Sequence, residues 1–72
     1  MTTISYALPI DEYVTLKVYD VLGKEVATLQ DGVVQAGYHQ ATLNASNLSS
    51  GMYFYRLSAG PYTSVRKLVV LK

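Results

Sequence analysis

The sequence has no cysteine and no tryptophan, and its 72 residues include one histidine and two prolines. Without cysteine, neither a disulfide nor a thiolate metal site can stabilise the chain. Packing must do so in a domain small enough that only roughly 60% of the surface of the unfolded chain can be buried. The length predicts one domain over residues 1–72, with no room for a second.

Clustered charge and long apolar runs are also missing. Six basic and five acidic residues are scattered singly and give a net charge of +1, whereas nucleic-acid-binding proteins carry clustered basic residues. The longest aliphatic run, Leu68 to Leu71, is too short to span a membrane. We therefore expect that the chain does not bind nucleic acid and does not insert into a membrane. The start of the chain lacks the regions of a secretory signal peptide, so export would need another signal.

Residues for catalysis or metal binding are sparse. His39 is the only side chain that titrates near neutral pH unperturbed, and catalysis needs a nucleophile or an acid–base pair within reach. We expect a structural role for His39, no enzymatic activity and no cofactor. A weak calcium site using Asp20 and Asp31 is the remaining metal hypothesis. The Asn-x-Ser patterns at Asn44 and Asn47 are interpreted as turn residues in preference to glycosylation sites.

Alternating apolar and polar residues predict a series of short strands. The clearest alternation runs from Tyr13 to Tyr19, where Val14, Leu16 and Val18 are expected to face the core. Further strands are predicted over residues 3–8, 25–30, 37–43, 51–57 and 62–71, with turns at 9–12, 20–24, 31–32, 44–50 and 59–61 and a short extended link at 33–36. The irregular apolar spacing within 25–30 indicates a bulged or edge strand, with a short helix as the alternative. No helix is required anywhere in the chain.

The segment from Gly51 to Leu57 is predicted to be a central strand, because it holds three aromatic residues in seven positions. Tyr53, Tyr55 and Leu57 would share one face, and the opposite face would be partly covered by neighbouring side chains or by a partner. Six or seven short strands without an internal repeat predict an all-β fold, a small antiparallel immunoglobulin-like β-sandwich.

Five sequence blocks, taken in order, resemble one family. They are Thr2 to Pro9, Val18 to Val26, Ala36 to His39, Leu48 to Leu57 and Lys67 to Lys72. The family is the type A C-terminal sorting domain of the type IX secretion system, which is similar in turn to the immunoglobulin-like domain of the flagellar hook-capping protein. The resemblance covers nearly the whole chain.

The resemblance implies a non-enzymatic secretion signal at the C-terminus of a longer secreted protein of the Bacteroidetes type, from which residues 1–72 would be an excised domain. In this family, cargo enters the periplasm by an N-terminal signal peptide. Outer-membrane type IX components then export it to the cell surface or the medium, and a sortase-like protease commonly removes the sorting domain. The implied partners are those secretion components and that protease.

Carried over position by position, the resemblance implies three recognition segments. They are Gly37 with Tyr38, Gly51 with Tyr53, and the terminal strand of Lys67, Leu68, Val69, Val70, Leu71 and Lys72. An exposed edge strand can accept a partner strand, and flanking lysines discourage uncontrolled pairing. The alternatives for the terminal strand are self-association and a purely structural role. Those for the whole domain are a structural or adhesive module and a carbohydrate-binding accessory domain that uses some of the seven tyrosines.

Overall fold

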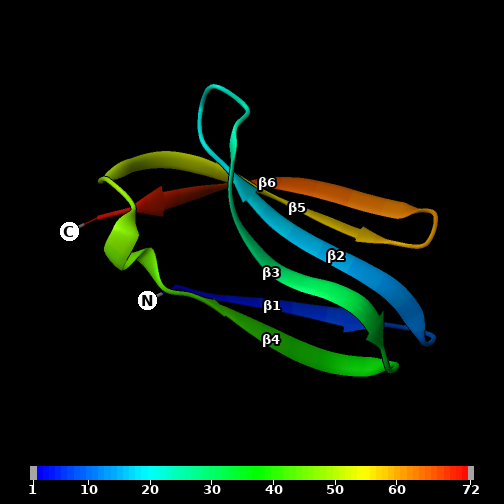
Figure 1. The fold of residues 1–72 in the computed structure, drawn as a ribbon. Helices are drawn as coiled ribbons and strands as arrows, with labels where there is room; N and C mark the ends of the chain where they lie inside the picture. Colours follow the sequence, from blue (N-terminus) through cyan, green and yellow to red (C-terminus); the bar gives the residue numbers. More distant parts are fainter. Residues whose placement is uncertain (1, 72) are drawn as a thin grey trace.

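Residues 2–71 are described by the computed structural model, and six antiparallel strands make up most of them (Figure 1). The strands are β1 (Thr2–Leu8), β2 (Glu12–Tyr19), β3 (Glu25–Val34), β4 (Gly37–Leu43), β5 (Gly51–Ala59) and β6 (Tyr62–Val70). They form a four-stranded sheet in the order β3-β2-β5-β6 and a two-stranded sheet of β1 and β4. The prediction of an all-β antiparallel sandwich is confirmed.

The core lies between the two sheets, and β2 is at its centre. Val14, Leu16 and Val18 are each 0% exposed, as their alternation predicts. The remaining buried apolar residues come from the other five strands, and they are Ile4, Leu8, Val34, Leu43, Tyr53, Leu57, Ala59, Leu68 and Val70. Within residues 2–71 no polar or charged side chain is buried. Stability therefore rests on apolar packing between the sheets.

The central position predicted for the segment from residue 51 to 57 is confirmed, because β5 lies between β2 and β6. Leu57 stands opposite Leu16 of β2, and both are buried. Tyr53 is buried on the same face. The outward face of β5 is partly covered, as predicted, since Phe54 is half-buried while Met52 and Arg56 are exposed.

The turn predicted at residues 31–32 is wrong, because β3 continues through it to Val34. The short link predicted at 33–36 is extended as far as Val34, where it is part of β3. Asp31 stands opposite Thr15, and its carboxylate accepts a hydrogen bond from the Tyr13 hydroxyl. A hydroxyl on the neighbouring strand thus supplies a hydrogen bond to a side chain that would otherwise favour a turn. The bulged edge strand is confirmed by two register shifts between β2 and β3 and by the position of β3 at the sheet edge.

Local side-chain hydrogen bonds determine the backbone conformation of two connections, one after β2 and one after β4. At the predicted turn after β2, the Asp20 carboxylate accepts bonds from the backbone N–H groups of Leu22 and Lys24, each at 2.9 Å. After β4, the Asn44 side chain accepts from Ser46 N at 3.0 Å and caps one 3₁₀ turn, η1 (Ala45–Asn47). This turn corrects the prediction that no helix is required anywhere. Leu48 follows it and packs against the core, as expected.

Candidate functional site

The predicted recognition residues lie at the two ends of the sandwich. In the register of β5 and β6, Gly51 pairs with Val70 and Tyr53 with Leu68, near the end of the chain (Figure 1). Gly37, by contrast, pairs with Leu8 where β4 begins, at the opposite end (Figure 1). Tyr38 follows Gly37. Within residues 2–71 the predicted positions therefore form two separate groups, and Lys72 lies outside the described residues.

The terminal strand alternates between buried and exposed residues. Leu68 and Val70 are 8% and 3% exposed and belong to the core, whereas Val69 is 56% and Leu71 85% exposed. Lys67 is also exposed. A partner could therefore touch the side chains of Lys67, Val69 and Leu71 directly, while Leu68 and Val70 hold the strand in place.

Two residues that sequence reasoning did not select lie beside these outward side chains. Met52 pairs with Val69 and Phe54 with Lys67, so they continue the same face onto β5. We call Met52, Phe54, Lys67, Val69 and Leu71 the terminal face. The alternation of residues 51–57 placed Met52 and Phe54 opposite Tyr53, but it could not show that the small sheet packs on the side of Tyr53 and leaves the side of Met52 without a second sheet.

The other predicted residues begin strands or support them. Gly37 and Gly51 open β4 and β5 with φ values of 126° and 152°, which side chains with a Cβ rarely adopt. Tyr53 is buried and its hydroxyl donates a hydrogen bond to the Ser49 carbonyl at 2.8 Å. The Tyr38 side chain is 93% exposed on the outer face of the small sheet. Tyr53 thus fixes the loop before β5, while Tyr38 is free to contact a partner.

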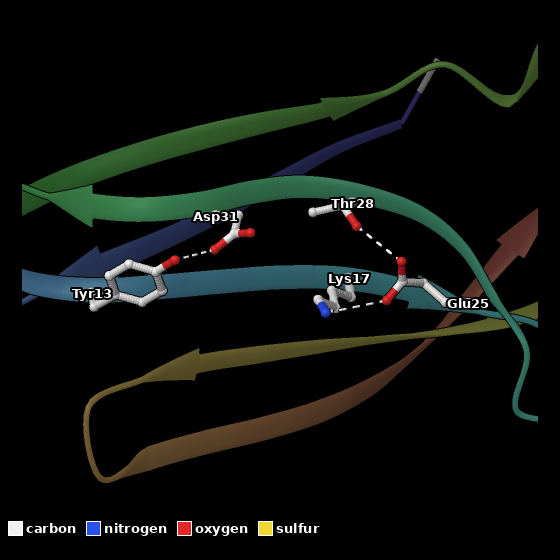
Figure 2. A network of polar contacts seen from close by, with 5 residues as sticks. All are labelled: Tyr13, Lys17, Glu25, Thr28 and Asp31. Atoms are coloured by element: carbon white, nitrogen blue, oxygen red, sulfur yellow. Dashed lines mark hydrogen bonds and ion pairs between the residues drawn. The ribbon is translucent and has the colours of Figure 1, made fainter.

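A polar network lies across β2 and β3 on the outer face of the large sheet (Figure 2). Lys17 Nζ lies 3.3 Å from Glu25 Oε1, and the Thr28 hydroxyl donates to Glu25 Oε2 at 3.1 Å. Glu25 raises the pKa of Lys17, first through the hydrogen bond between the two side chains and then through its negative charge. On β5 and β6, in contrast, Arg56 and Lys67 make no ion pair within residues 2–71. The positive charge of this face that has no acidic partner therefore lies on the β5–β6 half.

The hydrogen bond from Tyr13 to Asp31 gives a pH-dependent prediction. It raises the pKa of Tyr13 above the ordinary 10.0, and the charge of Asp31 adds to the effect. Since the folded-state pKa is the higher one, this contribution to stability is complete below pH 10.0 and is lost as the pH rises through the folded-state pKa. The difference in tyrosinate absorbance between the wild type and Tyr13→Phe should therefore titrate above pH 10.0.

Asp31→Ala provides the control for that titration. It removes both the acceptor and the charge, so the pKa of Tyr13 should return toward its ordinary value. An unchanged Tyr13 titration in Asp31→Ala would contradict the assigned cause.

The potential metal and catalytic residues have structural partners. His39 stacks on Tyr6 with ring centroids 5.6 Å apart, and its Nε2 donates to the Gln35 carbonyl at 2.6 Å. Asp20 caps a turn, and Asp31 accepts from Tyr13, so the two residues of the calcium hypothesis are engaged separately. No group of three or more His, Asp or Glu side chains that could hold a metal forms among residues 2–71. The same residues contain no helix long and apolar enough to cross a membrane.

A comparison with protein-family models matches residues 1–71 to the secretion system C-terminal sorting domain. The chain belongs to this family. The resemblance inferred from the five sequence blocks is thereby confirmed. Sorting domains of this family are signals for type IX secretion and lead to export to the cell surface or the extracellular space. Neither the curated proteins nor the solved structures gave a match.

Proposed function

We propose that this sorting domain is a non-enzymatic C-terminal signal that directs a longer cargo protein through the outer-membrane type IX machinery. The family match over residues 1–71 carries the proposal. The cargo passes the periplasm and reaches the cell surface or the medium of a Bacteroidetes-type cell. A sortase-like protease then removes the sorting domain. Residues 1–72 form one such domain.

The strand order supports an immunoglobulin-like assignment within this proposal. In immunoglobulin sandwiches, strands B and E share one sheet and strands C, F and G share the other. Here β1 and β4 take the places of B and E, while β2, β5 and β6 take those of C, F and G. β3 occupies the place of an added strand beside C. The assignment places β6, with its outward residues, at an edge of the larger sheet.

The terminal face is the proposed point of recognition by the secretion components. It combines exposed apolar side chains of Met52, Val69 and Leu71 with the exposed ammonium of Lys67. Exposed apolar patches with a polar rim are typical of contact sites. β6 is also an edge strand, so its backbone can pair with a partner strand or with a second copy. Gly37 and Tyr38 would provide a separate contact at the other end.

The proposed function is tested by fusing residues 1–72 to the C-terminus of a periplasmic reporter in a bacterium with type IX machinery. The reporter should appear at the cell surface or in the medium, and it should stay in the periplasm when the domain is omitted. A strain without a working outer-membrane export channel provides the second control. Retention of the intact fusion in the periplasm of the competent strain would refute the proposal.

The carbohydrate-binding alternative gains no support from the placement of the tyrosines. Tyr13, Tyr38 and Tyr62 are the strongly exposed ones. Tyr13 lies on the outer face of the large sheet, Tyr38 on the outer face of the small sheet, and Tyr62 at the β5–β6 turn. A sugar-binding platform needs several aromatic rings on one surface, and these three rings are spread over three surfaces.

A further inference from the structure

The two sheets differ in width, which leaves one side of the sandwich open. β1 pairs only with β4, so its other edge has no strand beside it within residues 2–71. A groove with a volume of about 200 Å³ runs between this edge and the inner face of β6. Ser5, Tyr6 and Ala7 line it from β1, Tyr55 from β5, and Ser64 and Arg66 from β6. Unpaired backbone groups thus lie next to a partly uncovered inner sheet face.

A pocket lies beside the groove at the β1–β2 end of the molecule. The groove and the pocket share Ala7 and Tyr62 as lining residues, so they are neighbours. The pocket has a volume of about 380 Å³ and is lined mostly by apolar residues, including Leu8, Pro9 and Pro61. Such a size and lining are typical of binding pockets, which use a few polar groups to orient a ligand.

Glu12 supplies the charged group of this pocket. Its carboxylate lies against Gly60, where an added Cβ would come within 2.6 Å of it. The Glu12 side chain makes no hydrogen bond or ion pair within residues 2–71. A carboxylate without a partner in a mostly apolar pocket is complementary to a cation on an apolar stem, as in lysine or arginine.

A second unpaired charge lies farther along the groove. Arg66 stands opposite Tyr55 in the register of β5 and β6 and makes no ion pair within residues 2–71. It follows Tyr62, a pocket residue, by four positions on the same strand, which corresponds to about 13 Å. The groove therefore has a negative group at one end and a positive group about four strand positions away.

We propose that the open side binds an extended segment of a partner protein, which adds to β1 as a third strand of the small sheet. Its lysine or arginine enters the pocket against Glu12, and an acidic residue four positions later meets Arg66. β1 runs toward the pocket, since Ile4 lines the groove and Leu8 the pocket. An antiparallel partner strand therefore starts at the pocket, with the basic residue first.

The same geometry determines the direction and the character of the partner residue that lies between the two charged ones. In an extended strand, positions i, i+2 and i+4 share a face. The basic and acidic residues therefore point inward together with the residue midway between them. That middle residue covers Tyr55 and the groove and should be apolar. This surface is separate from the terminal face, and the proposal does not depend on the export function.

The test uses isotope-labelled residues 1–72 and the peptide Thr-Thr-Lys-Thr-Val-Thr-Glu-Thr-Thr. Its matched control exchanges the lysine and the glutamate and keeps the composition. Amide shifts should change along β1 and at Ser64 and Arg66, and the control should bind about tenfold more weakly. In the double variant Glu12→Lys, Arg66→Glu the preference between the two peptides should reverse.

Four outcomes would overturn the proposal. They are the absence of shift changes in β1 with either peptide, equal affinity for both, an unchanged preference in the charge-swapped variant, and changes that only report association of the domain with itself. A second experiment uses a longer protein that carries residues before Met1. If this longer protein fails to bind a peptide that the isolated domain binds, a segment of the longer protein itself fills the groove, and this result would also overturn the proposal.

Discussion

Replacing Leu16 with alanine should lower the free energy of unfolding by about 3 kcal/mol, one of the largest effects available to a single substitution here. Leu16 is 0% exposed at the centre of β2 and stands opposite the buried Leu57. The truncation loses apolar burial and leaves a cavity, because neighbouring strands relax only partly. A chain of this length has a total stability of roughly 4 to 11 kcal/mol. Urea unfolding followed by circular dichroism measures the loss.

Leu22→Ala is the matched control for that substitution. Leu22 is 91% exposed in the turn between β2 and β3, so the same chemical change removes no core packing. We expect its free energy of unfolding to stay within about 0.5 kcal/mol of the wild type. Equal losses in the two variants would show that β2 does not occupy the core as described.

Removing residues 67–72 should unfold the domain. The deletion takes away Leu68 and Val70, which are buried against β5 and pair with Tyr53 and Gly51. Burial of two such side chains contributes about 3 to 6 kcal/mol, which is comparable to the whole stability of the domain. The amide spectrum of the truncated protein should therefore lose its dispersion. Loss of export after this deletion could then reflect unfolding as much as lost recognition.

Removing only Leu71 and Lys72 separates the two effects. Leu71 is 85% exposed and follows the last residue of β6, so its removal takes no residue from the core. This shorter truncation should retain a dispersed spectrum and a midpoint of unfolding close to that of the wild type. A folded protein after removal of residues 67–72 would contradict the placement of Leu68 and Val70 in the core.

Strong local patterns made most of the fold predictable from the sequence. The alternation in β2 identified its three core residues, and the aromatic segment identified β5. The continuation of β3 was missed because Asp31 and Gly32 resemble a turn, while the Tyr13 hydroxyl that binds Asp31 comes from another strand. Long-range partners of this kind are not visible in a local pattern.

The candidate surfaces were less predictable for the same reason. The sequence predicted a strand over residues 62–71, but the sheet order decides which of its two faces is covered. The groove beside β1 depends on the unequal width of the two sheets. Glu12 and Arg66 are far apart in the sequence and face the same open side only after the strands have paired.

Recognition of the domain through its terminal face is tested by comparing two triple variants in the reporter fusion. One is Lys67→Gln, Val69→Gln, Leu71→Gln on the terminal face, which leaves the buried Leu68 and Val70 in place. The other is Lys24→Gln, Val33→Gln, Leu22→Gln, which changes the same exposed residue types on and next to β3. Unfolding curves establish that both remain folded.

The measurement is the fraction of reporter that reaches the cell surface and the medium. Export of the terminal-face variant should fall about tenfold, the size expected when one contact worth about 1.4 kcal/mol is removed. The variant changed around β3 should be exported like the wild type. Equal export of the two folded variants would contradict recognition through the terminal face.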